Sequence, residues 1–167
     1  MSWKPGIDEI AQRGAWAEAL GGPDRVARQH ERGRLTIRER IDALVDPGSF
    51  REVGRLAGAG SYEDGQVRTV MPASYVMGLA RIDGRDVAVG GEDFAARGGT
   101  GSTARRKGGQ GGFVEDLAHE YRIPLINLID GAGGAVTSLK RRGYAPMPGT
   151  DDFGRSVELL GEVPVIT

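Results

Sequence analysis

The sequence predicts an α/β fold in which a helical arm precedes a sheet that contains parallel strands. Residues 1–50 have helical patterning but few large apolar side chains, so this arm has to pack on something else. From residue 75 onward, apolar strand-like runs alternate with helix-like runs, an order typical of parallel strands joined by crossover helices. The 167 residues have the length of one domain. We divide them into the arm, 1–50, and a sheet-forming part, 51–167.

Three helices are expected in the arm. The first spans Ile7 to Ala17 and is stopped by Gly21-Gly22-Pro23, and the second ends at Gly33, a natural left-handed cap. In the third, Thr36 and Glu39 have the spacing of a capping box. The apolar stripe of this third segment consists of Leu35, Ile37, Ile41 and Leu44. Because the stripe is narrow, we expect the arm to dock on the rest of the chain or on a neighbouring subunit.

The remaining residues predict a sheet with helices. Residues 54–72 are polar and glycine-rich, which predicts a loop or an irregular strand. In residues 75–92, two mostly apolar runs flank Asp83-Gly84, a strong signal of a hairpin turn. Further on, we expect a helix over 113–121, a buried strand within 122–130, a helix after the next glycine turn, another helix within 151–161, and a strand from 163.

Composition excludes several classes of function. Acidic and basic residues nearly cancel, 23 against 22, so no overall field favours nucleic acid or an anionic membrane. The absence of cysteine removes disulfides, thiolate zinc sites and cysteine nucleophiles, and it suits a cytoplasmic protein. No apolar run is long enough to span a membrane, and the first residues do not resemble a signal peptide. His30 and His119 are more typical of exposed helix histidines than of a catalytic pair.

The segment 128–138, LIDGAGGAVTS, raises the question of why a buried strand runs into small residues and then a helix. A dinucleotide-binding motif fails here at Val136, and a phosphate loop fails because Lys107 precedes Gly108 instead of Ser or Thr. The serine-hydrolase motif G-x-S-x-G is absent. Two interpretations remain: an ordinary glycine turn, or an oxyanion hole made of backbone N–H groups at a helix N-terminus.

A run of three cations, Arg105-Arg106-Lys107, follows an earlier glycine segment. Such a run either forms a solvated face or holds the phosphates of a ligand such as coenzyme A.

Three long segments resemble biotin-dependent acyl-CoA carboxyltransferase subunits of the propionyl-CoA carboxylase β type. They are RVARQHERGRLTIRERIDALVDPGSF (25–50), YVMGLARIDGRDVAVGGEDFAARGGTGS (75–102) and RIPLINLIDGAGGA (122–135). The resemblance implies a crotonase (ClpP-like) fold built from turns of ββα. Residues 51–167 would then be an incomplete N-terminal carboxyltransferase domain.

The resemblance also implies a site and a reaction. Gly133, Gly134 and Ala135 match the turn whose backbone N–H binds the thioester oxygen of an acyl-CoA. The Gly98-Gly99-Thr100 turn matches the wall of the CoA site, and Arg105, Arg106 and Lys107 are the candidates for its phosphates. The enolate formed at the thioester would attack the carboxyl group carried on N1 of biotin, with no metal. The implied partners are a biotin carboxylase or biotin carrier subunit and further copies of the chain, in a hexamer-like assembly.

Departures from the family pattern leave alternatives open. Residues 136–140 read VTSLK where the family has an Arg-Ile-Gln-Glu-Gly-like run, and residues 108–112 are unusually rich in glycine. One alternative is a decarboxylase subunit of the same fold, and another is a non-catalytic module that binds CoA or supports assembly. The zinc-ribbon β subunit of acetyl-CoA carboxylase does not fit, because cysteine is absent. In the family a second glycine motif and a second domain follow, so residues 1–167 alone are expected to be inactive.

Overall fold

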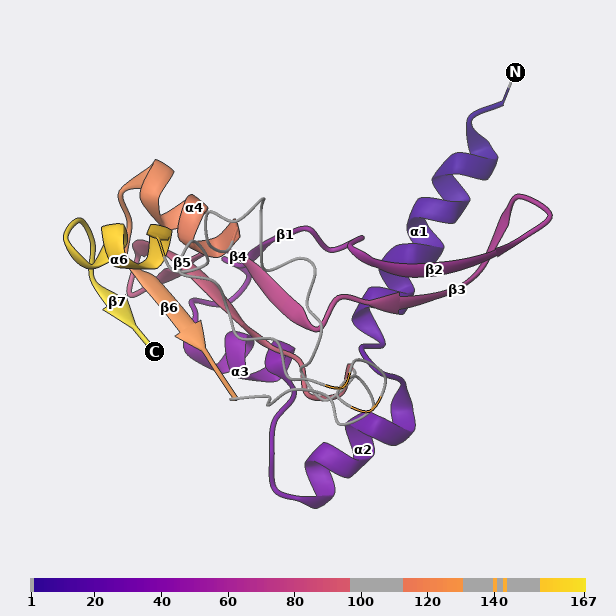
Figure 1. Cartoon of the computed structure of the whole chain (residues 1–167), viewed down its shortest axis with the longest axis horizontal. Coiled ribbons are helices and arrows are strands. Elements are labelled where there is room, and N and C mark those ends of the chain that lie inside the picture. The colour runs from indigo at the N-terminus through magenta and orange to yellow at the C-terminus, as the bar shows by residue number, and fades with distance from the viewer. Residues whose placement is uncertain (1, 97–112, 131–139, 141–142, 144–153) are drawn as a thin grey trace.

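The computed structural model describes residues 2–96, 113–130, 140, 143 and 154–167, which form a mixed α/β structure (Figure 1). The helices are α1 (Lys4–Glu18), α2 (Pro23–Glu31), α3 (Ile37–Leu44), α4 (Phe113–Tyr121) and α6 (Gly154–Leu160). The strands are β1 (Arg51–Val53), β2 (Gly58–Glu63), β3 (Gln66–Pro72), β4 (Tyr75–Ile82), β5 (Arg85–Glu92), β6 (Leu125–Leu128) and β7 (Val165–Ile166). Within these ranges, no helix has both the length and the apolar character needed to cross a membrane.

The main sheet has five strands in the order β1-β4-β5-β6-β7. Strands β4 and β5 form the predicted hairpin, and both Asp83 and Gly84 adopt the positive φ that its turn requires, 50° and 75°. Strands β5, β6 and β7 run parallel, as the alternation of strands and helices predicts. The edge strand β1 is antiparallel to β4, so the sheet as a whole is mixed.

Helices cover both faces of this sheet (Figure 1). Side chains of β4 alternate between the faces: Val76 belongs to a core on the side of α3, and Met77 to a core on the side of α4 and α6. The α4 side contributes Val114 and Ala118, and α6 contributes Leu159, all with 0% exposure. Because both faces are covered, the central strands are apolar along most of their length.

The arm docks on the sheet, as its narrow apolar stripe predicts. Ile37 and Ile41 are 2% and 0% exposed and share a core with Val89 of β5. The capping box of α3 is confirmed: Thr36 Oγ1 accepts from the N–H of Glu39 at 3.3 Å, and Glu39 Oε2 accepts from the N–H of Thr36 at 2.7 Å. Leu35 does not follow the prediction, because it lies before the helix and is 53% exposed.

The prediction of a loop or an irregular strand for residues 54–72 is correct only in part, because residues 58–72 form a hairpin with an irregular register between Ser61 and Tyr62. Strands β2 and β3 pair antiparallel around Asp64-Gly65, which has positive φ at both residues, 51° and 75°. All six residues of β2 are exposed, so this strand lacks the apolar alternation by which strands are recognised in a sequence. The ribbon is held against α1 instead, where Arg13 donates to the Tyr62 hydroxyl at 2.7 Å.

Candidate active site at the carboxyl ends of two parallel strands

The glycine and cation motifs predicted as the site lie outside the described residues. These are Gly98, Gly99, Thr100, Arg105, Arg106, Lys107, Gly133, Gly134 and Ala135. The structure describes the strand ends that lead into them, the ends of β5 and β6. Their geometry is the basis for the site.

The ends of β5 and β6 lie side by side at one edge of the sheet. The parallel register pairs Gly91 with Leu128, so both strands finish at the same level. Residue 97 follows the end of β5 by five positions, and residue 131 follows the end of β6 by three. In open sheets with parallel strands, ligands bind at this carboxyl edge. The structure therefore brings the chain to one edge just before each predicted glycine turn.

Two glycines near the end of β5 allow close packing there. A Cβ at Gly91 would lie 2.2 Å from Ile37 Cδ1 and 2.8 Å from the Leu128 carbonyl oxygen. A Cβ at Gly90 would lie 2.6 Å from the Tyr75 hydroxyl, which donates to Asn127 Oδ1 at 2.6 Å in a buried hydrogen bond. These two glycines thus make room for protein atoms, α3 on one face and a tyrosine on the other.

A chain of polar contacts joins α3 to both strand ends. Arg40 Nη1 lies 3.1 Å from Asp130 Oδ2, and the backbone N–H of Asp130 donates to Glu92 Oε2 at 3.1 Å. Arg40 belongs to α3, Glu92 is the last residue of β5, and Asp130 comes two residues after β6. The arm therefore helps to fix the relative position of the two strand ends.

Asp93 builds a buried turn directly after β5. Its side chain is 1% exposed, and its Oδ1 accepts the N–H of Ala95 at 2.9 Å while its carbonyl accepts that of Ala96 at 3.1 Å. Burial raises the pKa of Asp93, against the opposing effect of the two alanine N–H groups and of Arg38 and Arg25. Its Oδ2 has no hydrogen-bond partner among the described residues.

Arg38 lies on the arm side of this turn. Its two terminal nitrogens are each 2.8 Å from a carboxylate oxygen of Glu52, a bidentate pair in which both side chains are largely buried. Its Nε is buried and has no partner in the described part of the chain. Another arginine of the arm, Arg25, donates to the Ala95 carbonyl at 3.4 Å. The segment before residue 97 is therefore held by a charged group of the arm as well as by its own backbone.

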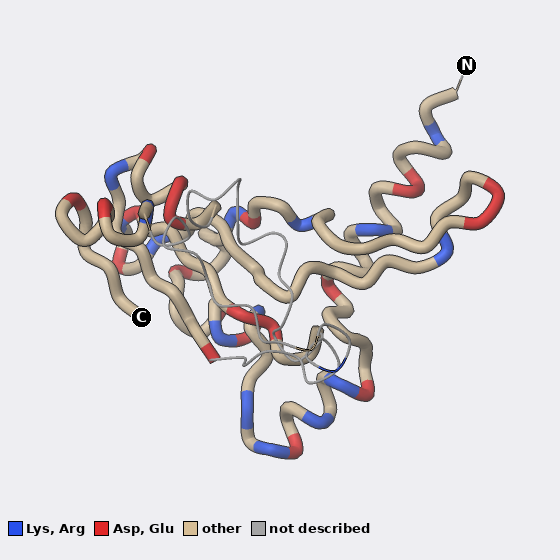
Figure 2. Tube along the Cα trace, viewed as in Figure 1, with Lys and Arg blue, Asp and Glu red and all other residues tan. Residues whose placement is uncertain are grey.

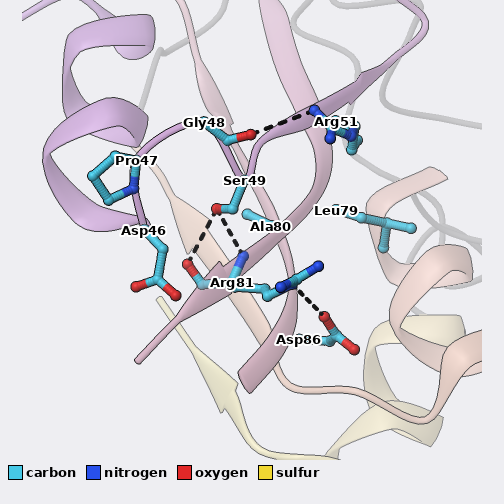
Figure 3. A pocket seen from close by; sticks show the side chains of 9 residues that line it. All are labelled: Asp46, Pro47, Gly48, Ser49, Arg51, Leu79, Ala80, Arg81 and Asp86. Atoms are coloured by element: carbon cyan, nitrogen blue, oxygen red, sulfur yellow. Dashed lines mark hydrogen bonds and ion pairs between the residues drawn. The ribbon is translucent and has the colours of Figure 1, made fainter. Parts of the chain in front are cut away.

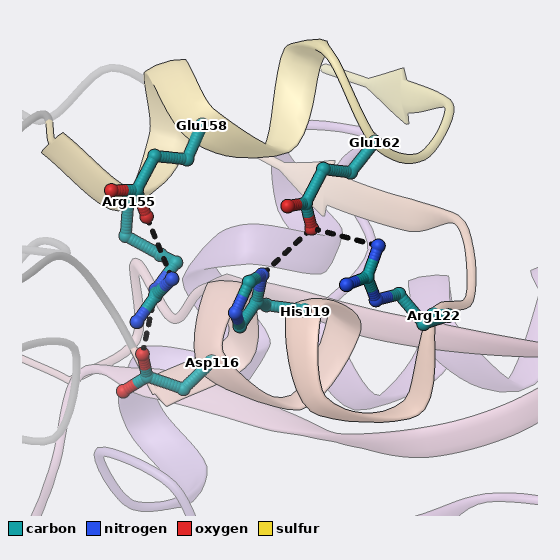
Figure 4. Close-up of polar contacts among 6 residues, drawn as sticks. All are labelled: Asp116, His119, Arg122, Arg155, Glu158 and Glu162. Carbon is teal, nitrogen blue, oxygen red and sulfur yellow. Dashed lines mark hydrogen bonds and ion pairs between the residues drawn. The ribbon is translucent and has the colours of Figure 1, made fainter.

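Both histidines lie on helices, His30 on α2 and His119 on α4. His30 is paired with Glu39 at 3.0 Å, and hydrogen bonds from His30 and from the Thr36 backbone hold the pKa of Glu39 below its usual value. His119 of α4 contacts Glu162 at 2.8 Å (Figure 4). In the ranges that the structure describes, no three His, Cys, Asp or Glu residues are grouped so as to hold a metal ion.

A cavity of about 300 Å³ lies beside the Asp83-Gly84 turn. Figure 3 shows the residues that line it. Its polar groups contact one another: Asp46 accepts both turn N–H groups at 2.9 and 2.8 Å, and Ser49 Oγ accepts the Arg81 N–H at 3.1 Å. These contacts stabilise the β4–β5 hairpin. This structural role accounts for the polar residues around the cavity, and no ligand has to be assumed.

The sequence reasoning missed the side chains that organise the strand ends. Glu92 and Asp93 are consecutive carboxylates at the end of an otherwise apolar run, and both are less than 10% exposed. Acidic residues are rarely buried without a partner. Two of them at the end of a predicted strand could therefore have indicated that their side chains organise this strand end. Nothing in the sequence places Arg40 beside Asp130, because 90 residues separate them.

Comparison with known protein families shows to which family the chain belongs. The model of the carboxyl transferase domain matches residues 28–167, most of the chain. The chain belongs to this carboxyl transferase family. The resemblance seen in the sequence is thereby confirmed.

Relatives and solved structures of this family support the assignment. The carboxyltransferase subunit of propionyl-CoA carboxylase from Haloferax mediterranei is 35% identical over 170 residues, which cover 100% of this chain and 32% of that protein. A probable biotin-dependent acyl-CoA carboxylase β2 subunit of Mycobacterium tuberculosis is 37% identical over 80% of this chain and 24% of its own length. The hexameric transcarboxylase 12S, solved with hydrolysed methylmalonyl-CoA bound, superposes with a TM-score of 0.71 at 28% identity, over 98% of this chain and 31% of that one. The chain thus spans less than a third of the length of these relatives.

Proposed function

We propose that the complete protein is the carboxyltransferase component of a biotin-dependent acyl-CoA carboxylase. It would move a carboxyl group from carboxybiotin to the α carbon of an acyl-CoA. The observation that carries this proposal is the family match over residues 28–167, combined with two parallel strand ends that meet where the predicted glycine turns begin. A crotonase-like fold for the complete domain, with its boundary near residue 50, belongs to the same proposal.

The proposed chemistry depends on backbone donors. The carboxyl group would replace a proton of the α carbon, and that proton would be taken up by the biotin nitrogen that gives up the carboxyl group. While the α carbon lacks its proton, negative charge would lie on the thioester oxygen. N–H groups of the turn at Gly133, Gly134 and Ala135 would stabilise that oxygen, and glycine lets the thioester approach without a side chain in the way. The turn at Gly98, Gly99 and Thr100 would form the wall of the CoA site. The strand-end contacts of Asp93 and Asp130 would hold the start of each turn in place.

The partners follow from the family. Carboxybiotin supplies the carboxyl group, carried by a biotin carboxylase or biotin carrier subunit. We assign no described residue to biotin, because the strand-end geometry by itself does not point to it. The complete protein is proposed to be a homo-oligomer, supported by the hexameric assembly of transcarboxylase 12S.

The test is carboxyl transfer by the complete protein, supplied with its biotin-carrying partner and a panel of short acyl-CoA thioesters. We expect carboxylated acyl-CoA to accumulate from carboxybiotin. Net formation of carboxybiotin from a carboxylated acyl-CoA, with no forward reaction, would identify the decarboxylase alternative. Binding of CoA without turnover in either direction would identify the non-catalytic module.

A second test addresses the oxyanion hole. Gly134→Val keeps the backbone N–H but places a branched side chain where the thioester would approach it. Turnover is expected to fall about 10²–10³-fold, as it does when such a donor can no longer be used, with the fold retained. The matched control is Gly6→Val on α1, an open position where an added Cβ has no neighbour within 4 Å. Full turnover by the Gly134 variant would show that this turn is an ordinary connection.

A further inference from the structure

A buried hydrogen bond crosses the main sheet beside the candidate active site. The hydroxyl of Tyr75, the first residue of β4, donates to Oδ1 of Asn127 in β6 at 2.6 Å. Strand β5 lies between β4 and β6, so the bond reaches across a whole strand. Both residues are buried, at 4% and 6% exposure. We refer to this hydrogen bond as the crossing bond.

Gly90 of β5 makes the crossing bond possible. It pairs with Asn127 in the parallel register, and the ring of Tyr75 lies over it. A Cβ at Gly90 would lie 2.8 Å from Cε1 of that ring and 2.6 Å from its hydroxyl, so any larger residue would lift the ring off the sheet. The crossing bond therefore depends on three strands, each of which contributes one residue.

The crossing bond is a polar contact in apolar surroundings. Tyr75 shares a core with Met77 and Leu125, and Leu125 lies on the same face of β6 as Asn127. Strand β6 carries no charged residue along its length (Figure 2). Two apolar side chains of similar shape would fill such a place with little loss of stability. A directional bond in this place therefore fixes geometry more than it adds stability.

The crossing bond acts where β6 ends. The parallel ladder of β5 and β6 finishes one residue after Asn127. Beyond it, the Ile129 N–H donates to the Asn127 carbonyl at 3.1 Å, and the Asp130 N–H donates to Glu92 Oε2 at 3.1 Å. Asn127 is thus bonded through its side chain to β4 and through its carbonyl to the chain that leaves β6. A shift of Asn127 would change the direction in which the chain continues.

We propose that Tyr75 and Asn127 are positioning residues for carboxyl transfer. The crossing bond fixes the direction in which the chain leaves β6, and thereby the backbone donors that the proposed function assigns to the turn at Gly133 and Gly134. This inference rests on the proposed function and adds two residues to it. Both side chains are too deeply buried to contact the substrate, so they act through the backbone of β6. Because such donors stabilise charge mainly in the transition state, their displacement lowers kcat and leaves KM for acyl-CoA nearly unchanged.

The experiment is a double-mutant cycle in the complete protein. Tyr75→Phe and Asn127→Leu each leave one buried polar group without its partner in the crossing bond, so each should lower the urea midpoint of unfolding. The double variant leaves neither group of the pair behind, and its midpoint should return toward the wild-type value. All three variants should lose about tenfold or more in kcat, because a misplacement of about 1 Å costs about 10²-fold. The double variant should therefore be stable but slow.

Tyr62→Phe is the matched control, because it also removes a tyrosine hydroxyl, the one that Arg13 contacts on the β2–β3 ribbon. Its kcat should equal that of the wild-type protein. If the kcat of the double variant recovers together with its urea midpoint, the crossing bond serves stability alone and the inference is wrong.

A measurement without turnover separates this inference from the proposed function. The amide of Asp130 should exchange faster with deuterium in the double variant than in the wild-type protein, because the end of β6 has lost a fixed contact. Unchanged exchange would overturn the inference, whatever the activity. A wild-type protein that transfers no carboxyl group, together with faster exchange in the double variant, would overturn the proposed function and still support the role of the crossing bond at the strand end.

Discussion

At the scale of single residues, Gly91 shows how the backbone of β5 depends on the absence of a side chain. A Cβ there would overlap Ile37 Cδ1 at 2.2 Å and press on the Leu128 carbonyl, so α3 or β6 would have to move. Gly91→Ala should therefore lower the free energy of unfolding by about 1–3 kcal/mol, the usual cost of overpacking. Urea unfolding measures this effect. Gly6→Ala on α1, where space is open, should be neutral or slightly stabilising.

Asp93 should make stability depend on pH. Its pKa is raised by burial, so between the ordinary aspartate pKa and the raised value the folded protein binds more protons than the unfolded chain. The free energy of unfolding should fall as pH rises through this window, and the contribution of the protonated carboxyl is fully present only below it. Asp93→Asn keeps the acceptor for the Ala95 N–H, so it should be the more stable protein near neutral pH and should lack this slope. Unfolding measured from pH 3 to 8 tests this, with the exposed Asp86→Asn as the control for loss of a carboxylate.

At the scale of elements, α3 is specified mainly by local signals. Thr36→Ala should cost about 1 kcal/mol of stability, because the Glu39 N–H loses its side-chain acceptor and the hydroxyl bond to Glu39 Oε2 is lost. Thr36→Ser keeps the hydroxyl and should retain most of the stability. Amide exchange in the complete protein should be slow at Ile41, whose side chain is fully buried. Rapid exchange throughout 37–45 would contradict the docking of the arm.

The elements that could be predicted are those with a complete local signal. The β4–β5 hairpin was recognisable because apolar runs flank its Asp-Gly turn, whereas the β2–β3 hairpin has the same Asp-Gly turn but an exposed first strand. The docking of α3 could be predicted from its stripe, but its place on the sheet could not. Contacts such as Ile37 with Gly91 depend on where the strands lie, which no local pattern encodes.

At the scale of the whole molecule, the candidate site depends on the register in which β5 and β6 pair. The glycine motifs lie more than 30 positions apart in the chain, and only the parallel pairing of Gly91 with Leu128 brings the strands before them to one edge. The sequence motifs could name the turns, and the alternation of strands and helices could predict a parallel sheet. Neither could show that the arm contacts the same edge through the ion pair of Arg40 with Asp130, since 90 residues separate these two in the sequence.

The greater length of the relatives gives the last prediction. Residues 1–167 span 32% of the Haloferax carboxyltransferase subunit, and the family resemblance implies a second glycine motif that adds backbone donors to the site. An oxyanion hole that lacks one donor loses about 2.7–4 kcal/mol of transition-state stabilisation. We therefore expect residues 1–167 alone to bind acyl-CoA weakly at best and to form no measurable carboxylated product. The measurement is product formation with carboxylated biotin, beside the complete protein at equal concentration. Comparable turnover by both would mean that the donors within residues 1–167 suffice for the reaction.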